Sequence, residues 1–343
     1  MTENVDDQSL RGGLKWLTES EVASLVDLND AMTALRNGFI EEARGTATAI
    51  DKSLGAWPAG AMQSLGSMMP RLHYAGFKTW VHTSRGATAI FSLFDMRDGR
   101  LLAVLEAATL GQIRTSAVSG LAVDVLAEAD VDEMAIVGTG AQALTQIAAV
   151  AAVRPLSRLR VYSPTAENRH AFVEKARARF PFDVVECDSL DRAVAGAPIV
   201  TLITRTTEPF LNADMLSPAA LLIAAGAILP AAAECRPDVL AATGLFVVDS
   251  LGNAQRNSRE LREHFGTSTK SWLNVRTLGA ILSDGTPPTD PAKLKFFKPM
   301  GSGLSDLSVA IMAYERAIER EVGIGIEQPV RVMPRWRLAA PAN

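Results

Sequence analysis

The part of the sequence most suited to chemistry is a set of three small residues, Gly138, Gly140 and Ala143. They follow the apolar run Met134–Val137 and precede an alanine-rich segment of helical composition, residues 144–153. A strand, a tight glycine turn and a helix together present free backbone N–H groups and a positive helix end to a pyrophosphate. Gly138 would permit the turn, Gly140 a close approach of the phosphate, and Ala143 the packing of helix against strand. The spacing predicts a dinucleotide site, with a tight turn that holds no ligand as the alternative.

Further candidates fall where such a site would use them. Gln142 could add a side-chain donor to the phosphate. Thr204 and Gly226 follow two later apolar strands, where an open parallel sheet places a nicotinamide, although Thr204 could equally be a strand-end cap. The predicted cofactor-binding residues are Thr115, Gly138, Thr139, Gly140, Ala141, Gln142, Ser163, Thr165, Arg169, Thr204 and Gly226.

The end of the second αβ strand bears on which dinucleotide is used. Sites that prefer NAD usually place an acid there, whereas this strand ends in Ser163-Pro164-Thr165. Small hydroxyl groups can donate to a 2′-phosphate, and Arg169 could face it across the first turn of the next helix. We therefore expect NADP(H), with NAD(H) as the second choice. The alternative is that Ser163 and Thr165 cap the helix while Arg169 points to solvent.

Composition excludes several classes of partner. The 343 residues carry a net charge of −4, so no basic excess favours nucleic acid, and apolar runs are too short for a membrane span. The polar segment Met1–Leu10 has no apolar signal core, which favours a cytoplasmic protein. Two cysteines are too few for a disulfide framework, and the four histidines show no metal-ligand spacing. We expect no metal.

The elements that would position these residues indicate an α/β protein. A capping box at Thr18–Glu21 opens a short helix, and a second helix is expected over about 29–44. Strand-like segments follow at 64–69, 77–82, 88–94 and 101–105, with a turn at Asp98-Gly99, and then a helix from Ala108 to about 129. Regular alternation comes next, with strands at 159–162, 184–187, 199–203, 221–225 and 246–248 and helices at 166–179 and 190–194. Such alternation is typical of a doubly wound parallel sheet, and a long helix over about 304–321 remains.

Five blocks in order give the chain a resemblance to the ornithine cyclodeaminase/mu-crystallin family of nicotinamide-dependent proteins. They are Gly76-Phe-Lys78-Thr, Ile113-Arg114-Thr115-x-Ala117, Val137-Gly-Thr-Gly-Ala-Gln-Ala143, Gly226-Ala-x-x-Pro230-x-x-x-Glu234 and Gly301-Ser-Gly-Leu-Ser-Asp306-Leu. The resemblance implies a Rossmann doubly wound parallel sheet, residues 126–299, inserted in a mixed α+β substrate-binding and dimerisation domain, residues 1–125 plus 300–343. We also expect a homodimer through the first domain, because its strands need a partner to cover their edges and apolar faces.

The same resemblance points to two catalytic residues, Lys78 and Arg114, which match the cations that grip a substrate α-carboxylate in this family. An arginine offers a planar fork to a carboxylate, and a lysine offers a point charge that can also donate a proton. Lys78 could instead be a solvated strand-end charge, and Arg114 could bind cofactor phosphate or an internal acid. Lys52 is a weaker third candidate. Thr115 could hydrogen-bond the pyrophosphate.

Ile228 stands where the ornithine-cyclising members of the family carry an aspartate. Because isoleucine cannot act as a base, the sequence argues against cyclodeamination and favours hydride transfer between NAD(P)H and the C=N bond of a 2-imino acid or ketimine. The expected partners are a small 2-oxo or imino acid and, where needed, an amine. Ile228, Met62 and Leu65 suggest a small or apolar side-chain pocket. A mu-crystallin-like protein that binds small molecules without turnover is the other reading.

Overall fold

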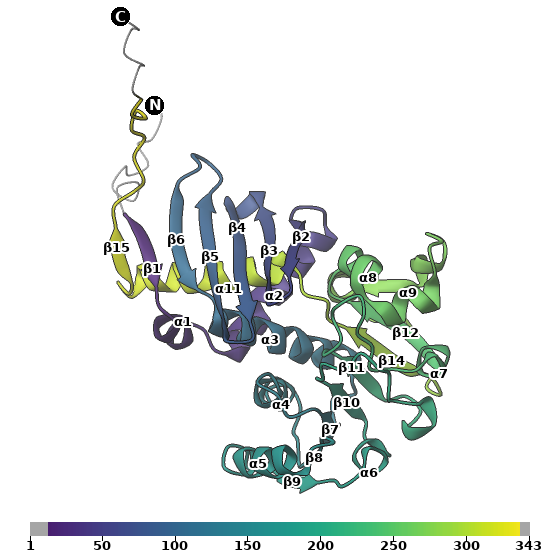
Figure 1. Cartoon of the computed structure of the whole chain (residues 1–343). Helices are drawn as coiled ribbons and strands as arrows, with labels where there is room; N and C mark the ends of the chain where they lie inside the picture. Colours follow the sequence, from purple (N-terminus) through teal and green to yellow (C-terminus); the bar gives the residue numbers. More distant parts are fainter. Residues whose placement is uncertain (1–12, 337–343) are drawn as a thin grey trace, which may run out of the picture.

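The computed structural model describes residues 13–336, which form two sheets side by side (Figure 1). The first, a mixed sheet, has the order β15-β1-β6-β5-β4-β3-β2. Its strands are β1 (Leu14–Leu17), β2 (Thr48–Trp57), β3 (Gly60–Met69), β4 (Tyr74–Thr83), β5 (Gly86–Asp95), β6 (Leu101–Glu106) and β15 (Ile324–Ile326). All neighbours pair antiparallel except β1 and β6, so this part of the fold is built from hairpins.

Four helices belong with the mixed sheet: α1 (Glu19–Leu25), α2 (Leu28–Ala43), α3 (Ala108–Leu126) and α11 (Gly303–Glu319). The last of them, yellow in Figure 1, crosses the sheet and packs against β2 to β5 and against α2. Most of the first two-thirds of α11 is buried, because its apolar and small residues face both the sheet and the other helices. The predicted helices at 29–44 and 304–321 and the capping box at Thr18 are confirmed.

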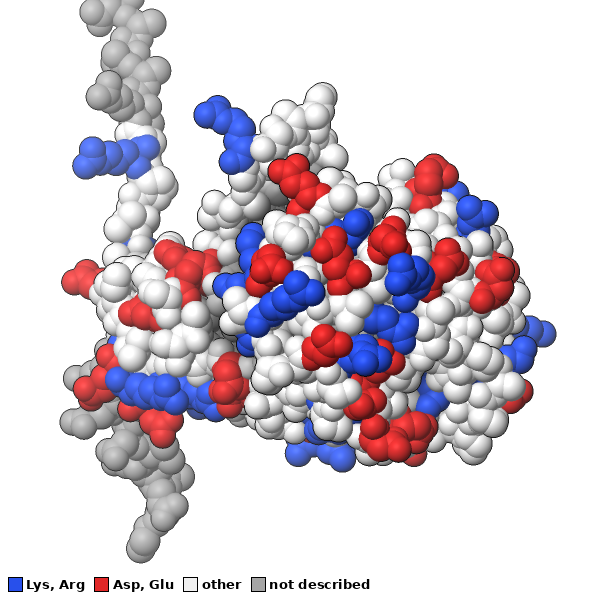
Figure 2. All heavy atoms as spheres, turned by 90° about the horizontal axis from the view of Figure 1, so that it is seen from below, with Lys and Arg blue, Asp and Glu red and all other residues white. Residues whose placement is uncertain are grey.

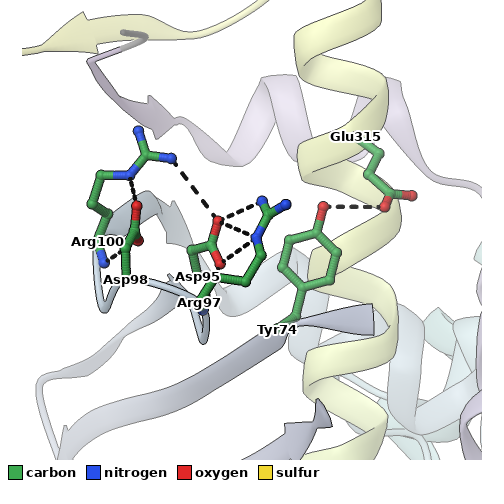
Figure 3. Close-up of polar contacts among 6 residues, drawn as sticks. All are labelled: Tyr74, Asp95, Arg97, Asp98, Arg100 and Glu315. Atoms are coloured by element: carbon green, nitrogen blue, oxygen red, sulfur yellow. Dashed lines mark hydrogen bonds and ion pairs between the residues drawn. The ribbon is translucent and has the colours of Figure 1, made fainter. Parts of the chain in front are cut away.

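The turn predicted at Asp98-Gly99 is present between β5 and β6, and a buried acid shapes it (Figure 3). Gly99 has a φ of 76°, and Asp95 accepts hydrogen bonds from the backbone and the guanidinium of Arg97. The Arg97 side chain holds the pKa of Asp95 at about 2. Beside this turn, Tyr74 Oη donates to Glu315 Oε1 at 3.2 Å, which links β4 to α11.

The second sheet is entirely parallel, with the order β13-β12-β14-β11-β10-β7-β8-β9. Its strands are β7 (Glu133–Val137), β8 (Arg158–Tyr162), β9 (Asp183–Glu186), β10 (Ile199–Leu202), β11 (Leu221–Ala224), β12 (Thr243–Val248), β13 (Val275–Thr277) and β14 (Leu294–Lys298). The strand order reverses between β7 and β10, so the crevice at their carboxyl ends is where such sheets bind ligands.

Helices cover both faces of the parallel sheet, as its buried residues show. Along β7, Met134 and Ile136 join the core that includes α3 and α4, whereas Ala135 and Val137 join a separate core on the other face. The helices of this part are α4 (Ala143–Ala151), α5 (Ala166–Arg177), α6 (Leu190–Val194), α7 (Pro237–Ala241), α8 (Leu251–Asn257), α9 (Arg259–Phe265) and α10 (Leu278–Asp284). The predicted α/β fold with a doubly wound parallel sheet beside a mixed α+β part is confirmed.

Surface charge agrees with the near-neutral composition. Figure 2 shows acidic and basic side chains interspersed on the face that it presents. In the part of the chain that the structure describes, no helix is long and apolar enough to cross a membrane. Over the same residues, no group of three or more His, Cys, Asp or Glu side chains could hold a metal ion.

Candidate active site

A cavity of about 1290 Å³ lies between the two sheets, over the carboxyl ends of β7, β10 and β11. Most of the predicted site residues line it. They are Lys78, Arg114, Thr115, Gly138, Thr139, Gly140, Ala141, Gln142, Ser163, Thr204 and Gly226. The structure therefore brings residues of β4, of α3 and of the parallel sheet to one opening.

The glycine turn has the geometry that a pyrophosphate requires. Gly138 has a φ of 110°, and a Cβ there would lie 2.6 Å from the Ile203 carbonyl oxygen, so a side chain cannot be accommodated. Gly140 faces open space. At the start of α4, Gln142 makes no side-chain cap, and its Oε1 is buried without a hydrogen-bond partner. Free helix N–H groups above an open glycine fit the phosphates of a dinucleotide.

Two cations and one acid meet on the opposite wall. Lys78 Nζ, from β4, donates to Asp306 Oδ1 at 3.0 Å, and Arg114 Nε, from α3, donates to the same oxygen at 3.2 Å. Asp306, on α11, is fully buried, while its other oxygen, Oδ2, has no hydrogen-bond partner. Two cations therefore share one carboxylate on this wall, an arrangement that can bind a further carboxylate from a ligand.

Space for the Lys78 amine depends on a glycine of α3. A Cβ on Gly111 would lie 2.8 Å from Lys78 Nζ. Burial lowers the pKa of Lys78, and Asp306 opposes that shift. Because a lysine with a lowered pKa gives up its proton more readily, the arrangement suits Lys78 to proton donation at the cavity wall.

Lys52, the weaker sequence candidate, lies close to this pair. The Lys52 and Lys78 ammonium groups lie 5.6 and 5.3 Å from the centre of the Trp80 ring. Burial lowers the pKa of Lys52 to about 8, with added repulsion from Arg114 and Lys78. The charge of Lys52 therefore changes as the pH passes through about 8.

The apolar wall of the cavity includes Trp80, Ala87, Ala89 and Ile228. The placement of Ile228 agrees with the sequence interpretation, whereas that of Met62 was wrong. Met62 pairs with Val81, on the sheet face opposite Lys78, and half of its surface is exposed. Leu65 pairs with Lys78 and therefore lies on the same face of the sheet. Side chains alternate between the two faces along a strand, so Met62, three positions before Leu65, lies on the opposite face. Leu65 is buried on the face of Lys78 but does not line the cavity.

At the adenosine end, Arg169 does not occupy the position that the sequence suggested. Its Nε bonds Glu186 Oε1 at 3.0 Å and its Nη1 bonds the Ser163 carbonyl at 2.7 Å, so it is buried rather than facing the cavity or solvent. Thr165 is the N-cap residue of α5 but makes no side-chain cap, and neither residue lines the cavity. Ser163 does line it. Thr115 also lines it, with its hydroxyl bonded to the Gly111 carbonyl at 2.7 Å.

Asp306 and Glu234 belong to the sequence blocks that carry the family resemblance, but the sequence predicted no role for either of these acids. Glu234 is fully buried behind Thr204 and Gly226. Its Oε1 accepts bonds from the Thr204 N–H at 2.8 Å and hydroxyl at 2.7 Å, and its Oε2 accepts from the N–H groups of Gly226 and Ala227 at 3.0 and 3.1 Å. It thereby joins the ends of β10 and β11. The position of Glu234 and Asp306 in the blocks of the family resemblance was the signal in the sequence that could have marked them as site residues.

Comparisons with known proteins agree with this geometry. A profile of the ornithine cyclodeaminase/mu-crystallin family matches residues 15–321. The chain is 31% identical to a Delta(1)-pyrroline-2-carboxylate reductase of Bacillus cereus (strain ATCC 10987 / NRS 248) over 241 residues, 69% of this chain and 74% of that protein. It is 29% identical to the ketimine reductase mu-crystallin of Mus musculus, covering 71% of this chain and 73% of that protein. The structure of Thermococcus litoralis Delta(1)-pyrroline-2-carboxylate reductase in complex with NADH and L-proline superposes with a TM-score of 0.84 at 22% identity, covering 91% of this chain and all of that one.

Proposed function

This chain belongs to the ornithine cyclodeaminase/mu-crystallin family, and from that membership we propose that it is an NAD(P)H-dependent oxidoreductase acting on the C=N bond of a 2-imino acid or ketimine. The observation that carries the proposal is the shared contact of Lys78 and Arg114 with Asp306, on the wall that faces the glycine turn. A dinucleotide site and an anion site open into one cavity. Relatives named pyrroline-2-carboxylate reductase and ketimine reductase support the same reaction class.

In this proposal, separate residues bind the substrate, orient it and supply the proton. Arg114 and Lys78 bind the substrate carboxylate and so fix the C=N carbon over the nicotinamide edge, where Thr204 and Gly226 line the cavity. When bound, the cofactor supplies the hydride. Lys78 supplies the proton that the reduced nitrogen requires, and Asp306 keeps the Lys78 amine directed toward the cavity. The apolar wall with Trp80 and Ile228 excludes water from the reacting carbon.

Ile228 lines the cavity and has no group that could act as a base on a substrate amine or on water. This supports net reduction over cyclodeamination. The test is a panel of cyclic imines and of 2-oxo acids with amines, monitored by NADPH and NADH absorbance, with Lys78→Met as the inactive control. Cofactor oxidation supports the proposal. Cofactor binding without turnover would favour a small-molecule binding protein, and proline formed from ornithine without net cofactor change would favour a cyclodeaminase.

We further propose that the two sheets mark two domains, with residues 126–299 as the dinucleotide-binding domain and the flanking segments as the substrate and dimerisation domain. The homodimer would form through the face of the mixed sheet that points away from Lys78. Trp57, Met62, Val81 and Ile90 are large apolar residues exposed on this face, which we call the outer face. Their exposure supports a second copy as the occupant.

A further inference from the structure

Glu234 is a buried acid of the site that takes no part in the chemistry proposed for Lys78, Arg114 and Asp306. Three of its four hydrogen-bond donors are backbone N–H groups, which can only donate, and each carboxylate oxygen faces at least one of them. Burial raises the pKa of Glu234, while Lys298 and the bonds from Thr204 oppose the shift. A protonated carboxyl group could direct its own hydrogen only to the Thr204 hydroxyl, because the other three groups are N–H donors. The hydrogen bonds therefore fit the ionised form.

The charge of Glu234 is not cancelled by its buried neighbours. Behind it, Glu260 Oε1 accepts bonds from the N–H groups of Glu234 and Cys235, at 2.8 and 3.1 Å. The other oxygen of Glu260 lies 2.7 Å from Lys298 Nζ, and both of these side chains are buried. Since Lys298 pairs with Glu260, the three groups together retain one net negative charge, and the group nearest the cavity is Glu234.

The position of this charge relative to the cavity is fixed by a close approach. A Cβ on Gly226 would lie 2.2 Å from the Thr204 nitrogen and 2.4 Å from Glu234 Oε1, so only glycine fits between the acid and the cavity. Thr204 and Gly226 both line the cavity at the ends of β10 and β11. Glu234 thus lies one residue layer behind the place where the nicotinamide would bind.

We propose that Glu234 is a positioning residue that also biases the bound cofactor toward its oxidised, positively charged form. This inference rests on the proposed function. The oxidised nicotinamide carries a positive charge that the reduced ring lacks, so a buried anion behind the pocket attracts one form and not the other. In a protein environment, a buried charge of opposite sign one residue layer away is expected to shift this preference by roughly tenfold. Such a bias favours hydride donation to the substrate, which is the direction of imine reduction.

The test compares Glu234→Gln with the wild-type protein. Glutamine has nearly the same length but no charge, and its amide nitrogen can donate only to the Thr204 hydroxyl, so the variant also loses the bond from the Thr204 N–H. Dissociation constants are measured by calorimetry for the oxidised dinucleotide, the reduced dinucleotide and ADP-ribose with the same 2′ substituent. We expect the ratio of the oxidised to the reduced dissociation constant to rise about tenfold in the variant, with ADP-ribose binding changed by less than about twofold. An equal loss for both dinucleotides would overturn the inference, because it would show a role in positioning alone.

A second variant, Glu234→Asp, keeps the charge and shortens the side chain. It should weaken both dinucleotides alike and leave their ratio within about twofold of the wild type. If the ratio of the oxidised to the reduced dissociation constant rises about tenfold in Glu234→Asp, the charge argument is overturned, because this variant keeps the charge. The aspartate variant therefore tests the inference even if Glu234→Gln does not fold. Wild-type protein that binds neither dinucleotide would instead overturn the proposed function, so the two failures are distinguishable.

Discussion

Lys78 and Asp306 are 228 positions apart in the chain, yet the lysine ammonium and the aspartate Oδ1 lie 3.0 Å from each other in a buried pair. Arg114 reaches the same oxygen from a third element. One carboxylate thus fixes the direction of both cations that face the cavity. The strand β4 and the helices α3 and α11 therefore meet at a single carboxylate.

Replacing Asp306 with asparagine should lower kcat/KM by about 100-fold, because both cations lose a charge-assisted hydrogen bond together worth about 3 kcal/mol. Steady-state kinetics at saturating cofactor provide the measurement. Asp30→Asn is the matched control, since Asp30 on α2 pairs with Arg316 on α11 away from the cavity. Equal losses in the two variants would mean that Asp306 acts only by holding α11 in place.

Arg114→Ala should raise KM for the oxo or imino acid and lower kcat/KM at least about tenfold, since a charge-assisted bond to the carboxylate is lost. Arg114→Lys should recover part of the affinity because it restores a positive charge without the fork. The control is Arg36→Ala, a half-exposed arginine paired with Asp124. Unchanged kinetics in a folded Arg114→Ala protein would remove Arg114 from the site.

Lys52 should make substrate binding sensitive to pH. Burial, together with Arg114 and Lys78, lowers its pKa to about 8. A lysine loses its positive charge as the pH rises through its pKa, so KM for a carboxylate substrate should increase between about pH 7 and pH 9. Lys52→Arg should flatten this rise because arginine stays charged. A KM profile that is the same in both proteins would exclude Lys52 as the cause.

Cofactor choice should not depend on Arg169. We expect a higher kcat/KM with NADPH than with NADH, since no acid stands at Ser163 to repel a 2′-phosphate. Arg169→Ala should lower the melting temperature, because Glu186 and the Ser163 carbonyl lose a buried donor, but should leave the NADPH/NADH ratio within about twofold. His170→Ala, which removes the exposed partner of Glu186, is the control. A ratio that falls with Arg169→Ala would place its guanidinium at the phosphate.

The outer face of the mixed sheet should hold a homodimer together. Light scattering should give a mass of twice 36.6 kDa for the wild-type chain. Met62→Asp with Val81→Asp puts two charges on directly paired positions of this face and should yield monomers. Leu273→Asp changes an exposed leucine elsewhere and should stay dimeric. A wild-type mass of one chain at micromolar concentration would contradict the dimer.

Local signals in the sequence predicted most of the parallel sheet. The helix at 190–194 has the predicted bounds, and the strands at 199–203 and 221–225 differ by one residue at one end. A short continuous apolar run bounded by turn residues indicates a buried strand without reference to distant residues. The strand β14 was missed, because its sequence Leu-Lys-Phe-Phe-Lys ends in a lysine that a strand interior would not ordinarily bury. Lys298 is buried only because Glu260 meets it there, and a partner 38 positions away leaves no local signal.

The sequence predicted those parts of the site that a single short motif forms. It did not predict the contacts between residues that are far apart in the chain. The glycine turn needs only residues 138–143 and was found. Asp306 was quoted in a family block, but its role depends on Lys78 and Arg114, which lie 228 and 192 positions away. Arg169 shows the opposite error. Its spacing from Ser163 suggested a ligand contact, while Glu186, on the next strand, takes the guanidinium instead.

The place of α11 in the chain affects the order in which the protein can form during synthesis. All eight strands of the parallel sheet lie between residues 133 and 298, so that unit has its whole chain before α11 emerges from the ribosome. The mixed sheet begins at residue 14 but lacks the helix that covers β2 to β5 until residues 303–319 follow. Until then Lys78 has no Asp306 to pair with, and its sheet face lacks the contacts that α11 makes. The part of the molecule that is translated first therefore completes its contacts only after the parallel sheet has been synthesised.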